Sequence, residues 1–320
     1  MIKIAGLGIA GSYIYSRLKN AGFDVMASEI KRDDYYIPCA YATNQIKINA
    51  LLKNIGIKID DYILSHADNI RIEGNGFSGV DFNSSGLITF DKNLYERDLL
   101  KNIDYTTQTI NMGTNDTIID ATGISRYYLG QIPDDRKFYT VEYLTDFSDK
   151  KDFYFYFLKN GNGYFWSFPL KKNYHVGVGS TDISDMKMVK DYRRLKITGR
   201  MIRMRPLFDN MFNNNVIGVG ESIGAVSPLT GEGIVPAIES SEILYQAIKK
   251  YSSINDIKEH YQNDMKKRFG YYDKLYGLVK NINNGKTFNF GNIMAIRSAI
   301  KSMNDFGIDM KIRKILMHFI

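Results

Sequence analysis

The chemistry that the sequence indicates first is nucleotide binding, at a glycine-rich segment near the start of the chain. Residues 6–11 read Gly-Leu-Gly-Ile-Ala-Gly, between an apolar run suited to a buried strand (residues 2–5) and a segment of helical character (residues 12–21). In this setting the first glycine permits a tight turn, the second lets the backbone approach a pyrophosphate, and the third lets the helix pack closely on the strand. The N-terminus of the helix attracts phosphate charge. The segment therefore predicts a βαβ unit that binds a dinucleotide.

An acidic residue, Glu29, follows the second strand of this βαβ unit, the position at which a dinucleotide site binds the ribose. Residues 23–27 resume a strand, and Glu29 follows at its end, placed to accept hydrogen bonds from ribose hydroxyls. Residues 74–79 match the same glycine pattern, but a turn-rich, strand-like stretch follows them instead of a helix. That second match is interpreted as hairpins, in which glycine serves turns. The sequence thus predicts one dinucleotide fold and no separate NAD(P)H domain.

Two later segments are suited to complete a cofactor site. Residues 216–221 form a short apolar strand that ends in Glu221, and a Gly-Glu-Gly turn at residues 231–233 then opens a helix over residues 235–248. The acid can bind sugar-like hydroxyls, and the helix N-terminus can stabilise negative charge on a ring. Residues 117–123 are another apolar strand that ends in a turn of small residues, suited to close approach of a cofactor.

Composition limits the class of protein. The chain has 320 residues, of which 44% are hydrophobic and 24% charged, so it can bury a sizeable core. A single cysteine excludes an internal disulfide and fits a reducing cytosol. No apolar run reaches the roughly 18 residues of a membrane span, and the N-terminus does not read as a signal peptide. These features predict a cytoplasmic protein.

The formal net charge of +7 indicates an ordinary solvated surface, because the basic residues are scattered along the chain. No nucleic-acid partner is predicted. Nor is a metal site, since His66, His175, His260 and His318 have no ligand-like spacing with one another or with Cys39.

Taken together, the segments resemble flavoproteins of the glutathione-reductase and p-hydroxybenzoate-hydroxylase type. Within these, the chain resembles the geranylgeranyl reductase family, which saturates prenyl chains of archaeal lipids, chlorophyll or quinones. Residues 164–169 read Tyr-Phe-Trp-Ser-Phe-Pro, similar to the family's Tyr-x-Trp-x-Phe-Pro signature, and residues 175–179 follow as its next strand. Residues 38–40, Pro-Cys-Ala, stand at the place of its cysteine loop. Residues 227–234 are similar to its Asn-Pro-Leu-Thr-Gly-Glu-Gly-Ile turn, and the resemblance spans about residues 1–250.

The resemblance implies an α/β fold with a Rossmann-type FAD-binding domain, an interleaved antiparallel-sheet substrate domain and a short C-terminal helical tail. The expected parts are residues 1–65, 91–135 and 211–250 for the FAD-binding domain, residues 66–90 and 136–210 for the substrate domain, and residues 251–320 for the C-terminal helical region.

The FAD-binding residues that the resemblance implies lie mostly in turns of small residues. They are Gly6, Gly8, Ala10, Gly11, Glu29, Cys39, Ala40, Ala42, Lys92, Gly123, Glu221, Gly231, Gly233 and Ile234. By the same resemblance, Ala10 and Gly11 would meet the FAD pyrophosphate and Glu29 the adenosine ribose. Residues 39–42 would line the isoalloxazine side of the cleft. Glu221 would hold the ribityl or phosphate region, and the residues at 233–234 would lie beside the flavin pyrimidine.

Three positions depart from the family's pattern. Glu221 stands where the family has Asp, and the longer side chain shifts the expected ribityl contact. Lys92 replaces an Arg, so a point charge replaces a bidentate group. Ala42 stands where the family has Gly.

The catalytic residues expected from the resemblance are Cys39, Tyr164 and Trp166, and the substrate-binding residues are Tyr164, Trp166 and Phe168. The three aromatic residues could wall an apolar tunnel for a prenyl chain, but their alternation equally describes one face of a sheet packed on a core. Cys39 could modulate the flavin or donate a proton, or could be a small buried residue. Glu232 could steady the flavin turn or favour the helix N-terminus.

The function that the resemblance implies is an FAD-dependent reductase, which saturates C=C bonds of prenyl (geranylgeranyl) chains of isoprenoid membrane lipids by hydride transfer from reduced FAD. Two alternatives remain open: an FAD-dependent monooxygenase of an apolar substrate, and a trimmed flavin- or lipid-binding homologue without activity. The electron donor would be NAD(P)H or a reduced ferredoxin docked on the basic surface. Residues 310–320 mix basic and apolar residues and could lie on the inner membrane face or pack as a helix on the core.

Overall fold

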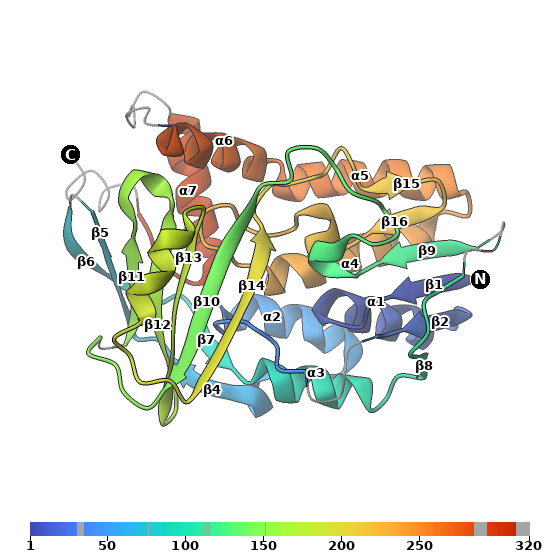
Figure 1. Ribbon diagram of the computed structural model, residues 1–320. Helices are drawn as coiled ribbons and strands as arrows, with labels where there is room; N and C mark the ends of the chain where they lie inside the picture. Colours follow the sequence, from blue (N-terminus) through green and yellow to red (C-terminus); the bar gives the residue numbers. More distant parts are fainter. Residues whose placement is uncertain are drawn as a thin grey trace.

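Residues 1–30, 35–75, 77–111, 113, 116–150, 152–284 and 293–311 are described by the computed structural model, and two large sheets and a small one organise them (Figure 1). The predicted fold class is confirmed. One half is a Rossmann-type α/β unit that carries the glycine-rich turn, and the other half is a largely antiparallel sheet. Helices of the last third of the chain connect the two halves.

The first sheet is parallel apart from one edge strand. Its six strands run in the order β15–β16–β9–β1–β2–β8, and only β15 pairs antiparallel. Their bounds are β1 (Ile2–Ala5), β2 (Val25–Ser28), β8 (Tyr105–Thr106), β9 (Thr117–Asp120), β15 (Phe212–Asn213) and β16 (Val216–Gly218). β-branched residues such as Ile4, Ile119 and Ile217 are fully buried in it, as expected where helices or loops cover both faces of a parallel sheet. The loops that follow β1, β9 and β16 lie together at the carboxyl ends of these parallel strands, which is where such sheets bind ligands.

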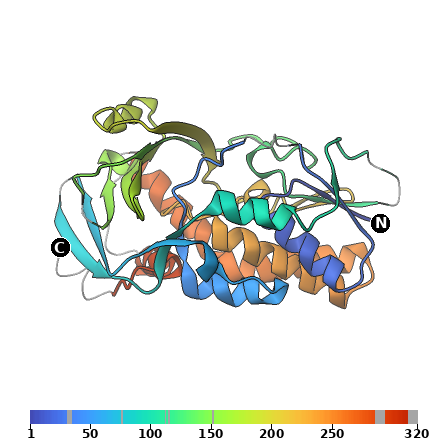
Figure 2. The ribbon, with the colours of Figure 1, turned by 90° about the horizontal axis from the view of Figure 1, so that it is seen from below.

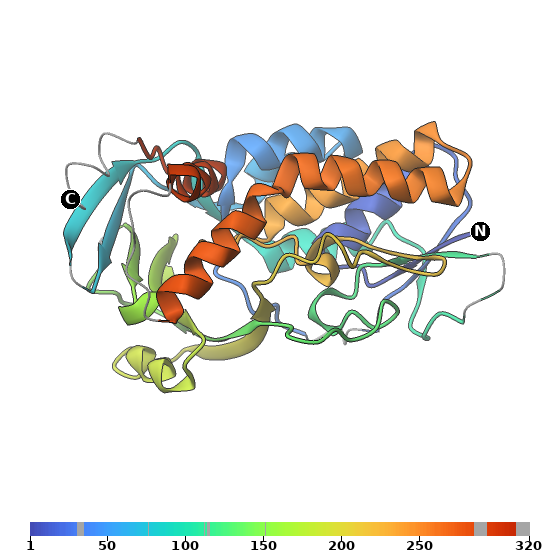
Figure 3. The same ribbon diagram turned by 90° about the horizontal axis from the view of Figure 1, so that it is seen from above.

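Seven α-helices are described. Their bounds are α1 (Ile9–Asn20), α2 (Gln45–Leu52), α3 (Lys92–Leu100), α4 (Ile234–Lys250), α5 (Ile254–Phe269), α6 (Tyr271–Asn283) and α7 (Ile293–Phe306). Helix α1 packs on α4, with α2 and α3 beside them (Figure 2). Helix α5 lies along α4, and α6 leads from it toward the second sheet (Figure 3), where the Asn283 amide donates to the carbonyl of Asn160. None of the described helices is both long and apolar enough to span a bilayer.

The second sheet has seven strands in the order β14–β10–β13–β12–β11–β5–β6. Their bounds are β5 (Asn69–Gly74), β6 (Phe77–Asn83), β10 (Lys137–Thr145), β11 (Phe153–Phe157), β12 (Gly163–Leu170), β13 (Asn173–Ser180) and β14 (Lys196–Arg203). All neighbours are antiparallel except β11 and β5, which pair parallel. The second glycine match lies at the β5–β6 hairpin, as the sequence predicts.

A small third sheet joins the two halves. Strand β7 (Leu87–Phe90) pairs with β3 (Ala42–Asn44) and β4 (Ile63–His66). The segment 66–90 therefore contributes to two sheets, because β5 and β6 belong to the large one. The membrane hypothesis for residues 310–320 concerns positions that lie almost entirely outside the described residues.

Candidate functional site

A cleft of about 570 Å³ lies between the open edge of the parallel sheet and one face of the seven-stranded sheet. This volume falls in the range of small-molecule and cofactor sites. All but one of the sequence-predicted site residues line it: Gly6, Gly8, Ala10, Glu29, Cys39, Ala40, Ala42, Lys92, Gly123, Tyr164, Trp166, Phe168, Glu221, Gly231, Gly233 and Ile234. The exception is Gly11, which lies beneath the turn instead of on the cleft wall.

The glycine-rich turn has the geometry expected of a phosphate site. Gly6 has a φ of +88°, in the region that favours glycine. A Cβ on Gly11 would lie 1.8 Å from the carbonyl oxygen of Gly6, so only glycine lets α1 pack this closely on β1. Among the described residues, no side chain caps the N-terminus of α1, and no acidic residue stands in its first turn. Ile9 and Ala10 of this turn line the cleft, so the positive end of the helix is directed at it.

Glu29 reaches the same turn from the end of β2. Its buried carboxylate accepts a hydrogen bond from the backbone N–H of Leu7 at 2.7 Å. This contact holds the acid at the edge of the turn, where the sequence predicts a ribose contact.

The loop after β9 is held by a residue that the sequence did not single out. The buried Asp120 carboxylate accepts from the Thr122 hydroxyl at 2.6 Å and from the backbone N–H groups of Tyr128 and Leu129 at 2.9 and 3.0 Å. The short turn η3 (Gly123–Ser125) follows, with Gly123 at a φ of +64°. The hydrogen bonds to Asp120 thus hold the loop in place, and its small residues line the cleft.

Glu221 enters the cleft from the turn η6 (Gly220–Ile223), which follows β16. Its carboxylate accepts from the backbone N–H of Arg203 at 3.0 Å and forms an ion pair with Arg200, a cleft residue of β14. This ion pair raises the pKa of Arg200. Glu221, which is longer than the Asp of the family's pattern, is therefore paired with a cation from the seven-stranded sheet. Arg200 is accordingly added to the candidate site.

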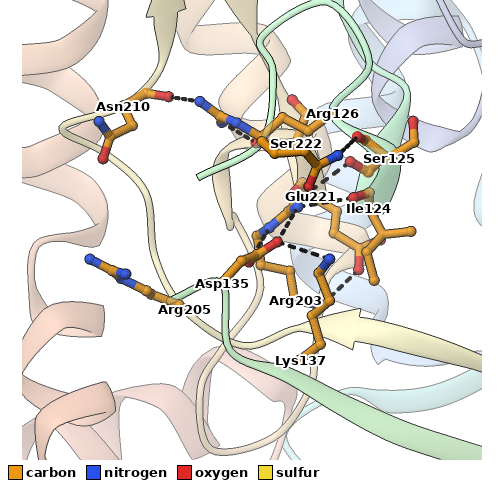
Figure 4. A network of polar contacts seen from close by, with 12 residues as sticks. Ile124, Ser125, Arg126, Asp135, Lys137, Arg203, Arg205, Asn210, Glu221 and Ser222 are labelled. Atoms are coloured by element: carbon orange, nitrogen blue, oxygen red, sulfur yellow. Dashed lines mark hydrogen bonds and ion pairs between the residues drawn. The ribbon is translucent and has the colours of Figure 1, made fainter. Parts of the chain in front are cut away.

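A buried network beneath this acid links the two halves (Figure 4). Arg203 is fully buried, and its guanidinium binds both carboxylate oxygens of Asp135 at 2.8 Å. It also donates to the carbonyl oxygens of Ile124 and Glu221 at 2.9 and 2.7 Å. Arg126 donates to the carbonyl of Ser222 nearby at 2.6 Å. The loops that form one wall of the cleft are thus tied to β14.

The turn before α4 closes the cleft on another side. Gly231 has a φ of +65°. The buried Glu232 carboxylate accepts from the backbone N–H of Val235 at 2.9 Å and from the Thr43 hydroxyl at 3.1 Å, and burial raises its pKa to about 7. Glu232 therefore bonds to the N-terminus of the helix, as one of the two interpretations has it, and also lines the cleft.

The three aromatic residues of β12 face the cleft from the seven-stranded sheet. Tyr164, Trp166 and Phe168 alternate along the strand, as one sheet face requires, and all three line the cleft while their rings are largely buried. The Tyr164 hydroxyl donates to the carbonyl of Thr230 and so connects this face to the turn before α4. The rings both pack the core and wall the cleft.

Lys92, which the resemblance implies as a cofactor-binding point charge, is paired with an acid of its own helix. Its ammonium group is buried and lies 2.6 Å from the Glu96 carboxylate, one turn further along α3. Both residues line the cleft, so Lys92 presents part of an ion pair to it.

The Cys39 thiol also lines the cleft, and its sulfur accepts a weak hydrogen bond from the backbone N–H of Tyr41 at 3.4 Å. Burial raises the pKa of this thiol, although Lys92 and the Tyr41 N–H partly oppose the effect. The thiol form is therefore favoured at neutral pH.

We expect Cys39 to react with iodoacetamide more slowly than a free cysteine near neutral pH, because the thiolate is the nucleophile. The chain has one cysteine, so mass spectrometry of the intact protein reports its alkylation directly. The same protein unfolded in guanidinium chloride is the control and should react at the ordinary rate. Alkylation of the folded protein faster than that control would show a stabilised thiolate and contradict the expectation.

No protein-family model matches the chain. Over 88% of its length the chain is 27% identical to an uncharacterized protein of Methanocaldococcus jannaschii, of which it covers 91%. Over 46% of its length it is 27% identical to digeranylgeranylglycerophospholipid reductase 3 of Methanosphaera stadtmanae, of which it covers 38%.

Solved structures match almost the whole chain. A geranylgeranyl bacteriochlorophyll reductase-like protein from Thermoplasma acidophilum has a TM-score of 0.72 at 16% identity, covering 95% of this chain and 98% of that one. PqsL from Pseudomonas aeruginosa, a probable FAD-dependent monooxygenase, has a TM-score of 0.68 at 16% identity, covering 88% and 96%. The chain has the fold of FAD-dependent flavoproteins. The resemblance carried by the sequence motifs is thereby confirmed at the level of the fold.

The motif-based prediction misses four residues in or next to the cleft. Arg200 and Glu142 line it from the seven-stranded sheet. The Nδ1 atom of His175 on β13 lies 3.6 Å from a carboxylate oxygen of Glu142, and Asp120 holds the η3 loop. For His175 the sequence did contain a signal, because its alternation with Gly177 and Gly179 places all three residues on one face of a strand, where the two glycines leave room beside the histidine. Among the described residues, no group of three or more His, Cys, Asp or Glu side chains is placed to hold a metal ion.

Proposed function

We propose that the protein binds FAD in this cleft and saturates C=C bonds of prenyl chains of membrane lipids. The observation that carries the proposal is that one continuous cleft joins a nucleotide-type turn to an apolar sheet face. Gly6 and Glu29 lie at the first end, and Tyr164, Trp166 and Phe168 at the other. The partial likeness to a digeranylgeranylglycerophospholipid reductase supports the choice of substrate.

The described residues fit FAD. The uncapped N-terminus of α1 suits the pyrophosphate, and the Glu29 carboxylate at the edge of the turn suits the adenosine ribose. The Glu221–Arg200 pair suits the polar ribityl region, and the N-terminus of α4 suits the electron-rich pyrimidine end of the ring. When it is bound and reduced, FAD supplies a hydride.

The residues of the apolar end would hold and shield the substrate. Burial of a hydrocarbon chain contributes about 0.8 kcal/mol per CH₂, so the faces of Trp166 and Phe168 favour a long prenyl chain over a short polar molecule. The bond from Tyr164 to the Thr230 carbonyl fixes one ring in place. A chain held against these rings excludes water from the reacting bond.

The experiment is anaerobic turnover followed by mass spectrometry. FAD-loaded protein reduced with dithionite is incubated with lipids that bear geranylgeranyl chains, and each saturated bond adds two hydrogens to the product. We expect a stepwise gain of mass, and no gain with reduced FAD alone or with unreduced protein. Absence of any gain while the flavin is bound and reducible would contradict the proposal.

The likeness to a probable FAD-dependent monooxygenase favours hydroxylation of an apolar substrate as the second candidate. It predicts rapid oxygen consumption in the presence of NAD(P)H and a product that gains one oxygen atom. The two candidates therefore differ in the mass of the product and in their need for oxygen.

A further inference from the structure

A buried carboxyl group without a hydrogen-bond partner lies in the wall of the cleft. Glu142 of β10 is 4% exposed and lines the cleft. Among the described residues, neither of its carboxylate oxygens has a hydrogen-bond partner. The other buried acids of the site differ, since Asp135 and Glu232 each accept several hydrogen bonds. An unpaired charge in such surroundings is costly, so the neutral acid is favoured.

The strand register places this acid beside the aromatic wall. Glu142 lies opposite Gly177 on β13, and Gly177 lies opposite Trp166 on β12. A Cβ on Gly177 would lie 2.2 Å from the Trp166 indole. The glycine therefore leaves a hollow that the indole occupies between β12 and β10. The acid and the predicted substrate-binding rings thus share one face of the sheet.

A path of polar groups leads away from the acid. The Nδ1 atom of His175 is 3.6 Å from a carboxylate oxygen of Glu142, and its Nε2 atom is 3.1 Å from the Tyr36 hydroxyl. Tyr36 is partly exposed, and the Lys196 ammonium lies 3.6 Å from the centre of its ring. The three side chains connect the cleft wall with the protein surface.

Burial keeps the Glu142 carboxyl group neutral at neutral pH. Burial raises the pKa of Glu142 to about 8, although the Trp166 indole and the Cys39 backbone N–H that face it partly oppose this. Burial also lowers the pKa of His175 to about 3. At neutral pH a carboxylic acid therefore faces an uncharged imidazole. The titratable or charged groups of the neighbouring elements are the Cys39 thiol, the Tyr41 hydroxyl and the guanidinium of Arg200.

We propose that Glu142 is the proton donor of the reaction, and that His175 and Tyr36 form the path by which it regains a proton from solvent. The inference rests on the proposed prenyl reduction. Saturation of a C=C bond needs a hydride on one carbon, which reduced FAD supplies, and a proton on the other. The electron pair of the π bond forms the second C–H bond with the acidic proton of Glu142. The O–H bond breaks, and the resulting carboxylate takes the Nδ1 proton of His175 while Nε2 of the same ring accepts the proton of the Tyr36 hydroxyl. Solvent returns a proton to Tyr36, so the imidazole stays neutral throughout.

The first test needs no turnover. The chain contains one tryptophan, and Trp166 faces the acid, so its fluorescence in the FAD-loaded full chain reports the titration of Glu142. We expect a transition near pH 8, accompanied by loss of the infrared carbonyl band of a protonated carboxylic acid. Both signals should disappear in Glu142→Gln, which has nearly the same shape, and both should remain in Cys39→Ser. Signals that persist in Glu142→Gln would overturn the proposal.

The second test separates this proposal from the proposed function. In the anaerobic assay, Glu142→Gln should lose about 100-fold in the rate of bond saturation while it retains FAD, and Glu142→Asp should recover part of the loss. The wild-type rate should fall above pH 8, where the acid ionises. His175→Gln should retain the first turnover and slow the following ones. Equal rates in wild type and Glu142→Gln would overturn the proton donor alone. A wild-type protein that binds FAD and saturates no chain would overturn the proposed function, and the proton donor with it.

Discussion

Replacement of Arg203 by methionine is expected to lower the free energy of unfolding by about 3–5 kcal/mol, the cost of breaking a buried ion pair by removing one partner. Arg203 is fully buried, and both carboxylate oxygens of Asp135 depend on it at 2.8 Å. Methionine fills much of the volume but leaves the buried carboxylate with the ion pair to Lys137 at 3.1 Å and without the two bonds from the guanidinium. The variant also loses the bonds to the carbonyl oxygens of Ile124 and Glu221. FAD affinity should therefore fall as well, because these two residues line the cleft.

Urea unfolding at neutral pH measures the loss, and Arg205→Met is the matched control. Arg205 lies two residues further on (Figure 4). It donates to carbonyl oxygens of the same loop, Pro133 and Asp134, at 3.2 and 3.1 Å, but in an exposed setting. Its replacement should cost less than about 1 kcal/mol, as for other exposed polar contacts. Equal losses in the two variants would contradict the argument.

The pH dependence of stability provides a second check on the same pair. Burial raises the pKa of Asp135, but Arg203 and Lys137 outweigh burial and hold it below its ordinary value. A group whose pKa is lowered by folding contributes stability above its unfolded pKa and loses it as the pH falls. Stability should therefore decrease in acid for the wild type. In Arg203→Met the part of this contribution that comes from Arg203 is already missing and only Lys137 remains, so the decrease should be smaller.

Local patterns identified residues that the structure brings together at one end of the cleft. The turn at residues 6–11, the acid at the end of β2 and the small-residue turns after β9 and before α4 all line the cleft or pack beneath it. Each of these features depends on residues close together in sequence, where turn chemistry and strand pattern act directly. The ion pair between Lys92 and Glu96 could also have been predicted from the sequence, because the two residues have the i, i+4 spacing of a helix.

The polar residues of the seven-stranded sheet could not be predicted in the same way. Glu142 alternates with apolar residues along β10, a pattern that normally describes a solvated face. In the structure Glu142 lines the cleft, opposite Gly177 of β13. The partners Arg203 and Asp135 are 68 positions apart, and Arg200 meets Glu221 across two sheets. Contacts of this kind join residues far apart in the sequence and depend on the topology of the fold, so local sequence patterns cannot predict them.

Replacement of Gly11 by alanine should both destabilise the protein and weaken its binding of FAD. The new Cβ would lie 1.8 Å from the Gly6 carbonyl oxygen and 3.1 Å from the Cβ of Ala121. The first contact is with backbone, which cannot rotate away, so α1 must move off β1. Overpacking of this kind costs about 1–3 kcal/mol. The displacement also moves the N-terminus of α1 away from the position that suits a pyrophosphate, and we expect FAD affinity to fall at least about tenfold, equivalent to roughly 1.4 kcal/mol.

Gly277→Ala is the matched control, because the same atom is added in the interior of α6 at a place where no other element of the described chain lies within 4 Å. There the substitution should stabilise the protein by up to about 1 kcal/mol, since alanine favours a helix over glycine. Urea unfolding gives the two stabilities, and a titration of flavin fluorescence gives the two affinities. Comparison of the two variants thus separates the general effect of an added methyl group from the effect of a clash between α1 and β1. If Gly11→Ala unfolded like Gly277→Ala and bound FAD as tightly as the wild type, close packing of α1 on β1 would not be what forms the phosphate site. The Glu29 carboxylate and the N-terminus of α4 would then have to supply the binding energy.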